Sequence, residues 1–155
     1  MKVKKLAIQD LYVLTELFEY NDVEQMISEC TRDIRGKIVD IFVLYEGSTL
    51  IGELHVMYES DDKNYAVRGK RAYLFAFRIH NDFQNRGYGT YLLKEVLGIL
   101  EKNGYYEFTV GVEDDNDRAI HMYQAQGFQE LLLRKQEEYQ GDKYEYNLYL
   151  KRGMV

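Results

Sequence analysis

A nearly continuous apolar stretch, Ala72–Ile79, is followed by a polar loop and by a turn with two glycines, Gly87 and Gly89. An apolar run of this length is typical of a strand that is covered on both faces. Apolar residues then recur at helical spacing up to Asn103, and residues 106–112 alternate as in a further strand. A strand, a helix and a second strand in this order predict a right-handed parallel βαβ unit.

The rest of the chain predicts short strands and helices around this unit. Asp10 and Asp22 are each placed to cap an early helix, and Asn116 or Asp117 is placed to cap a later one. Strands are expected at 3–8, 38–45, 50–58, 128–134 and 143–150. We therefore expect an α/β (α+β) fold in which a mixed, mostly antiparallel twisted sheet of about seven strands is flanked by about four helices. The predicted element order is β-α-α-β-β-β-α-β-α-β-β.

Composition favours one folded domain over residues 1–155. The chain has no proline, and 46% of its residues are hydrophobic, so it contains no proline-rich linker. Its single cysteine, Cys30, excludes an internal disulfide and a cysteine-rich metal site, which favours a cytoplasmic protein without a bound metal. Met26, Ile27 and Ile34 share a helical face with Cys30, so we expect this thiol to pack in the core.

Net charge and hydropathy limit the classes of partner that this chain is expected to bind. The net charge of −6 repels a nucleic-acid backbone and mildly favours a cationic partner. No apolar stretch reaches the ~20 residues that a membrane span requires. We therefore expect neither a nucleic acid nor a membrane as a partner.

The turn that contains Gly87 and Gly89 is a candidate phosphate site. Glycines let the backbone approach a ligand closely, and the first N–H groups of a helix attract an anion. The alternative is an ordinary tight connection between a strand and a helix. The dinucleotide pattern G-x-G-x-x-G fails because Leu92 occupies its third glycine position, and the Gly-Lys-Ser/Thr of a P-loop is absent.

Two separate motifs carry a resemblance to a known family. Gln84, Gly87 and Gly89 form the pattern Q-x-x-G-x-G, and a second pattern, N-x-x-A-x-x-x-Y-x-x-x-G-F, runs from Asn116 to Phe128. In residue type and in their order along the chain, the two motifs resemble those of the GNAT superfamily of acyl-CoA-dependent N-acetyltransferases. The resemblance is strongest over residues 72–128. The predicted element order agrees with the GNAT fold over nearly the whole chain.

The resemblance implies acetyl-CoA as co-substrate, held between two parallel strands that splay apart. It implies main-chain bonds to pantetheine and the thioester from Phe77, Arg78 and Ile79. Gly111 interrupts an otherwise β-branched and aromatic strand, which fits a place where a ligand or a bulge needs room. Asn116 would reach the pantetheine amides, and Ala119 would leave space beside it. The pyrophosphate would lie on the motif loop and on backbone N–H groups, which gives the residues Gln84, Asn85, Arg86, Gly87, Tyr88, Gly89 and Thr90.

Tyr123 matches the tyrosine that many family members use as general acid toward the CoA thiolate. The alternative is that Tyr123 packs on its helix or only orients CoA. The expected function is direct transfer of an acetyl group to an amine in a ternary complex. A non-catalytic module that binds or senses acyl-CoA is the alternative.

The base and the acceptor are less constrained. The strand 72–79 has no carboxylate, so the base candidates are Glu113, His80, and Glu53 or His55, which share one strand face. Each is also explained as a surface residue, and a water relay needs none of them.

The acceptor is expected to be a small-molecule or peptide amine, with a cationic one favoured, and a homodimer is compatible with the fold. Residues that could recognise an ammonium group are Glu19, Tyr20, Asp22, Tyr139 and Tyr144. The polar connection 59–70 is expected to be a lid or an extended hairpin tip.

Overall fold

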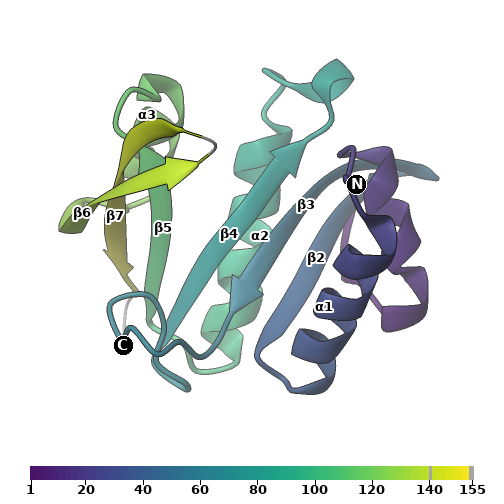
Figure 1. The fold of residues 1–155 in the computed structure, drawn as a ribbon, viewed down its shortest axis with the longest axis horizontal. Helices are drawn as coiled ribbons and strands as arrows, with labels where there is room; N and C mark the ends of the chain where they lie inside the picture. The colour runs from purple at the N-terminus through teal and green to yellow at the C-terminus, as the bar shows by residue number, and fades with distance from the viewer. Residues whose placement is uncertain (140, 154–155) are drawn as a thin grey trace.

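The computed structural model describes residues 1–139 and 141–153, and within these ranges seven strands form one sheet in the order β1-β2-β3-β4-β5-β7-β6 (Figure 1). The β4–β5 pair is parallel, and every other neighbouring pair in the described ranges is antiparallel. This arrangement confirms the predicted βαβ unit and the mixed, mostly antiparallel sheet. The strands are β1 (Lys2–Lys5), β2 (Val39–Glu46), β3 (Thr49–Met57), β4 (Arg71–Ile79), β5 (Glu107–Glu113), β6 (Glu130–Tyr139) and β7 (Asp142–Arg152).

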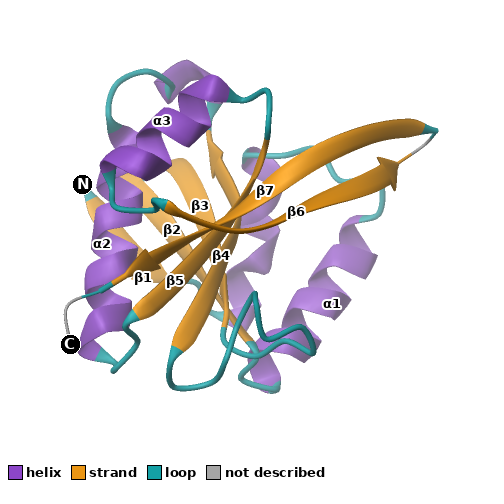
Figure 2. Cartoon of the chain, turned by 90° about the vertical axis from the view of Figure 1, so that its left-hand side faces the viewer, coloured by secondary structure: helices purple, strands orange, loops and turns teal. Residues whose placement is uncertain are grey.

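Helices cover both faces of the sheet. Figure 2 shows α2 and α3 on one side and α1 on the other. None of the helices in the described ranges is long and apolar enough to span a bilayer. The α-helices are α1 (Val23–Arg35), α2 (Tyr88–Lys102) and α3 (Asp117–Ala125), and the 3₁₀ helices are η1 (Ile8–Glu16) and η2 (Asn81–Phe83).

Each face of the sheet has its own apolar cluster, because side chains alternate between the faces of a strand. On the α2 side, Leu92, Leu93 and Val96 pack against Leu54 and Leu74 of the sheet. On the α1 side, the buried residues come mainly from η1, α1, β2 and β3, and they are Leu6, Leu11, Leu14, Met26, Val39, Ile41, Val43 and Leu50. Cys30 packs against this second cluster, as expected, although its side chain is only half-buried.

The caps predicted for the helices are mostly confirmed. The Asp22 side chain accepts a hydrogen bond from Gln25 N at 3.0 Å and caps α1, and Asn116 caps α3. The prediction for Asp10 is wrong. The first helix is a 3₁₀ helix that already begins at Ile8, so the N–H of Asp10 bonds to the carbonyl of Ala7 and Asp10 lies inside the first turn.

A β-bulge in β4 opens the sheet. Glu53 pairs with Arg78 and His55 pairs with Phe75, so β4 has one residue more than β3 between these pairs. Ala76, which lies in this interval, has a φ of +47°, a conformation that L-residues rarely adopt. The parallel pairing of β4 and β5 stops at Leu74, and Figure 1 shows the two strands diverging beyond it. An extra residue bends a strand and increases its twist, which accounts for the divergence.

Two expectations near this opening need correction. Gly111 pairs in regular register with Leu148, so the bulge lies in β4 and not at this glycine. The connection 59–70 is not an extended hairpin tip, because Val67 and Arg71 form its only bridge in the described residues. It lies against β5 instead, where Thr109 Oγ1 donates a hydrogen bond to the carbonyl of Tyr65 at 2.7 Å.

Candidate functional site

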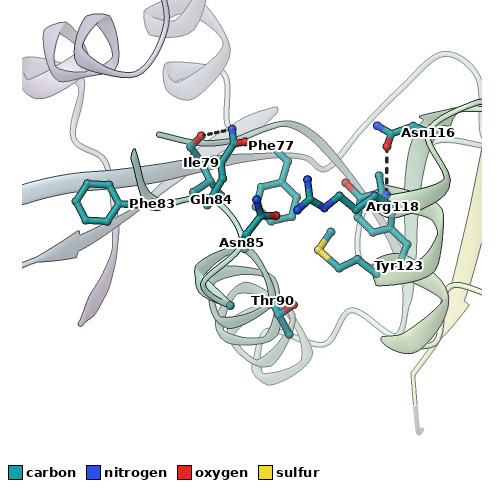
Figure 3. A pocket seen from close by; sticks show the side chains of 13 residues that line it. Phe77, Ile79, Phe83, Gln84, Asn85, Thr90, Asn116, Arg118 and Tyr123 are labelled. Atoms are coloured by element: carbon teal, nitrogen blue, oxygen red, sulfur yellow. Dashed lines mark hydrogen bonds between the residues drawn. The ribbon is translucent and has the colours of Figure 1, made fainter. Parts of the chain in front are cut away.

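A cleft of about 470 Å³ lies where β4 and β5 diverge. It is bounded by the end of β4, the loop that follows, the first turn of α2 and one side of α3 (Figure 3). Ten of the predicted cofactor residues line it: Phe77, Ile79, Gln84, Asn85, Gly87, Gly89, Thr90, Asn116, Ala119 and Tyr123. The two sequence motifs, which lie about 30 residues apart, therefore meet in one cavity, as the parallel βαβ topology requires.

The loop before α2 is held by Gln84. Its Nε2 donates hydrogen bonds to the carbonyl of Ile79 at 3.1 Å and to Oδ1 of Asn81 at 3.2 Å. Asn85 and Gly87 both have positive φ, +65° and +83°, which turns the chain sharply into the helix. Gly87 is the N-cap of α2, and no side chain caps this end. The first N–H groups of α2 therefore face the cleft without a capping side chain, and they favour an anion there.

The opposite wall comes from α3. The Asn116 Oδ1 accepts a hydrogen bond from Ala119 N at 3.2 Å, which leaves the amide Nδ2 free to donate to a ligand. Arg118 extends from α3 toward the loop that carries Asn85 (Figure 3). Its guanidinium adds a permanent positive charge to the same cleft as the N-terminus of α2.

Sequence reasoning missed three lining residues, Phe83, Arg118 and Met122. Met122 lies three positions after Ala119 and four positions after Arg118. Helical periodicity applied to the second motif would therefore have found both Met122 and Arg118. Phe83 lies in the loop, where no periodicity applies.

Three predicted residues do not line the cleft. The Arg78 side chain lies on the α1 side of the sheet, where its Nη1 donates to the Tyr20 hydroxyl at 3.2 Å. The Tyr88 hydroxyl donates to Oε2 of Glu46 at 2.7 Å, and the Arg86 guanidinium lies 5.8 Å from the centre of the Phe83 ring. In sequence, Arg78 lies between the lining residues Phe77 and Ile79, and Arg86 and Tyr88 lie on either side of Gly87. The main-chain bonds that the resemblance implies for these three residues stay a prediction.

Tyr123 lines the cleft from α3. Its side chain is 8% exposed and packs edge-on against Phe128 and at a tilt against Phe77. Burial raises the pKa of Tyr123 above its usual value, and the neighbouring Tyr73 adds to the shift. The phenol is therefore protonated at neutral pH and can donate a proton or a hydrogen bond into the cleft.

A second pocket of about 210 Å³ lies on the α1 side of β4. Its lining includes Tyr20 and Cys30, and His55, Ala76 and Arg78 from the strands. Among the predicted acceptor residues, Tyr20 lines this pocket, Asp22 caps α1 and Glu19 is exposed to solvent. The side chains of Tyr139 and Tyr144 lie outside the described part of the structure.

The base candidates lie in different places. Glu53 and His55 share one face of β3, as predicted, and Oε1 of Glu53 lies 2.6 Å from Nε2 of His55. Glu113 is exposed at the end of β5, and Nδ1 of His80 accepts a hydrogen bond from Asp82 N at 3.1 Å. Among the described residues, no three histidine, cysteine, aspartate or glutamate side chains are placed to hold a metal ion together.

Comparison with known proteins identifies the fold and the family. The model of the acetyltransferase (GNAT) family matches residues 6–128. The chain belongs to the GNAT family. Both motifs of this GNAT chain and all the residues that line the cleft lie within the matched residues.

Relatives differ in the amine that they are named for. A ribosomal protein bS18-alanine N-acetyltransferase of Salmonella typhimurium is 36% identical over 64 residues, which is 41% of this GNAT chain and 43% of the relative. A ribosomal-protein-alanine N-acetyltransferase structure from Brucella melitensis has a TM-score of 0.79 at 15% identity, covering 98% of this chain and 99% of that one. A spermidine N-acetyltransferase from Vibrio cholerae has a TM-score of 0.78 at 15% identity, covering 98% and 95%. At such identities the structures show a shared GNAT fold, not a shared acceptor.

Proposed function

We propose that this GNAT chain transfers an acetyl group from acetyl-CoA to an amine by direct transfer in a ternary complex, with Tyr123 as general acid. The observation that carries this proposal is the cleft at the divergence of β4 and β5, which joins an uncapped helix N-terminus to a buried, protonated tyrosine. One end of the cleft favours a phosphate, and the other end offers a proton.

The two ends suit the two parts of acetyl-CoA. The N–H groups at the start of α2 and the Arg118 guanidinium attract the pyrophosphate. The main chain at Phe77 and Ile79 lies at the strand gap, where hydrogen-bonding groups are no longer paired between β4 and β5. An extended pantetheine arm can occupy this gap, and its thioester then lies near Tyr123.

The chemistry requires an attacking amine, and a proton for the departing thiolate. As the carbon–sulfur bond breaks, the Tyr123 phenol donates its proton to sulfur. The raised pKa of Tyr123 keeps the proton on the phenol until the thiolate forms. A thioester sulfur held next to the phenol offsets the weak acidity of this group. The acceptor is a small-molecule or peptide amine, in keeping with relatives named for an alanine of a ribosomal protein and for spermidine.

The first experiment measures acetyl-CoA binding by calorimetry and CoA thiol release with four amines: spermidine, an alanine-starting peptide, a lysine peptide and n-butylamine. Tyr123→Phe should lower kcat by about 10²-fold while acetyl-CoA still binds. Tyr12→Phe is the matched control, because the Tyr12 side chain is 62% exposed and distant from the motif. An undiminished rate in Tyr123→Phe would exclude the acid role, and binding without thiol release would favour a sensing module.

A further inference from the structure

Glu53 is a buried carboxylate that the cofactor cleft does not use. Its side chain is fully buried, and its Oε2 has no hydrogen-bond partner. Its other oxygen, Oε1, lies 2.6 Å from Nε2 of His55 and 3.6 Å from Nη1 of Arg78. Replacing a buried charged pair by well-packed apolar side chains is often neutral or stabilising, so stability alone does not account for a buried Glu53. This arrangement therefore needs another explanation.

The contact with Glu53 selects one tautomer of His55. A carboxylate only accepts hydrogen bonds, so Nε2 of His55 carries the proton and donates it to Oε1. The remaining ring nitrogen, Nδ1, then has a free lone pair. Nδ1 is not among the fully buried, unpartnered atoms of the described residues, and His55 lines the second pocket. Nδ1 is thus the remaining acceptor of a side chain that lines the second pocket.

The second pocket and the cofactor cleft are lined by neighbouring residues of the β4 bulge, on opposite faces of the sheet. Phe75 and Ala76 line the second pocket, whereas Phe77 lines the cleft. His55 pairs with Phe75 in the sheet, and neighbouring strands lie roughly 5 Å apart. His55 is thus next to the strand segment that separates the acceptor side from the expected position of the thioester.

We propose that His55, oriented by Glu53, is the general base that deprotonates the acceptor ammonium in the second pocket. This inference rests on the acetyl transfer proposed above. His55 is the catalytic residue, and Glu53 is a positioning residue that acts through it. The base and the acid then lie on opposite faces of the sheet, with the thioester between them.

The proton and bond changes balance as follows. The ammonium gives one proton to Nδ1 of His55, and the neutral amine attacks the acyl carbon to form a carbon–nitrogen bond. The carbon–sulfur bond breaks, and Tyr123 donates its proton to sulfur. The attacking nitrogen of a primary amine then gives a second proton to the phenolate of Tyr123, which restores the phenol, and keeps its third proton as the amide N–H. The His55 imidazolium releases its proton to solvent. One acetyl-CoA and one ammonium give one amide, one CoA thiol and one solvent proton.

Charged groups and two neutral titratable groups, from several elements, face this site. They come from β3, β4, α1 and the segment before α1. Three are carboxylates and one is a guanidinium, which favours a cationic acceptor. The groups are Glu53, Arg78, Glu29, Asp33, Cys30 and Tyr20.

Kinetics on His55→Gln and Glu53→Gln test the proposal, with the amine of the four that releases CoA thiol fastest. We expect kcat to fall by about 10²-fold in His55→Gln and by about 10-fold or more in Glu53→Gln, most strongly at low pH, where the amine depends on a base. Acetyl-CoA binding should be unchanged, since the cofactor cleft lies on the other face of the sheet. Free imidazole should restore part of the rate to His55→Ala but not increase that of the wild type.

His121→Gln is the matched control, because this histidine is exposed on α3 and lines neither cavity. Nitrogen NMR of the three histidines at mildly alkaline pH gives a readout that needs no turnover. The signal lost in His55→Gln should show a proton on Nε2, and a proton on Nδ1 would overturn the proposal. So would a His55→Gln enzyme with the rate and pH profile of the wild type. Absence of thiol release from the wild type would instead refute the acetyl transfer itself, and the base role with it.

Discussion

Leu74 and Phe77 lie on the same face of β4, although three positions separate them. Leu74 is buried in the cluster on the α2 side, and Phe77 packs against that cluster and lines the cleft. In a regular strand, residues three apart point to opposite faces. The extra residue in the bulge reverses the alternation, so Phe77 and Ile79 face the cofactor cleft and Arg78 faces the second pocket.

The left-handed conformation of Ala76 predicts a sharp dependence on the side chain there. Ala76→Val should lower the free energy of unfolding by about 2 kcal/mol, because a β-branched residue is strained at a φ of +47°. Ala76→Gly should stay within about 1 kcal/mol of the wild type, since glycine tolerates this conformation. Urea unfolding of the three proteins measures the difference. Equal stability of the valine and glycine variants would show that the bulge is not strained.

Gly52 is expected to be essential for the position of Ile79. A Cβ at Gly52 would lie 2.6 Å from Cδ1 of Ile79 and 2.9 Å from the carbonyl oxygen of Arg78. Gly52→Ala should therefore lower the free energy of unfolding by about 1–3 kcal/mol and weaken acetyl-CoA binding, because Ile79 lines the cleft. Thermal unfolding and calorimetry test both effects.

Gly98→Ala is a control for Gly52→Ala, because it should change the free energy of unfolding in the opposite direction. Gly98 lies inside α2, and a Cβ there would meet nothing within 4 Å. The change should raise the free energy of unfolding by about 0.5–1 kcal/mol through helix propensity. If both alanine variants shifted stability in the same direction, crowding at Gly52 would not be the cause.

Two functions of Asn116 can be separated by substitution. Asn116→Asp keeps an oxygen that caps α3, whereas Asn116→Ala loses the cap and should lower the free energy of unfolding by about 1 kcal/mol. Both variants lose the Nδ2 donor, so both should bind acetyl-CoA more weakly than the wild type. Calorimetry decides the matter: an aspartate variant with wild-type affinity would mean that Asn116 serves only as a cap.

Alkaline pH should destabilise the protein through its buried tyrosines. Burial raises the pKa of Tyr73 to about 12, whereas an unfolded tyrosine titrates near 10. From about pH 10 to about pH 12 the folded chain retains a proton that the unfolded chain loses, so stability falls as pH rises. Below about pH 10 both states are protonated, and Tyr73 contributes no pH dependence.

Tyr73→Phe should make this loss less steep, by at most about 1.4 kcal/mol per pH unit. Urea unfolding at a series of pH values between about 9 and 12 measures the slope. The exposed Tyr12 serves as control, because Tyr12→Phe should leave the slope unchanged. Identical slopes for Tyr73→Phe and the wild type would contradict the assigned cause.

The sequence by itself determined the elements, their order and the family, because these depend on local signals. Apolar periodicity, helix caps and the spacing of Gln84, Gly87 and Gly89 are encoded within a few residues of one another. The spacing of two between Glu53 and His55 also predicted their shared face. It did not predict that Glu53 would be buried with an unpartnered oxygen, because burial depends on contacts between segments far apart in the chain.

Only the tertiary structure decided which cavity each β4 side chain enters. The bulge leaves no clear mark in the apolar run 72–79, yet one inserted residue exchanges the two faces of the strand beyond it. Helical periodicity places Arg118 on the same side of α3 as the motif residues, but only the tertiary structure shows that this side of α3 faces the loop before α2. Pairing register and helix placement arise from contacts between segments far apart in the chain, and local sequence patterns do not specify them.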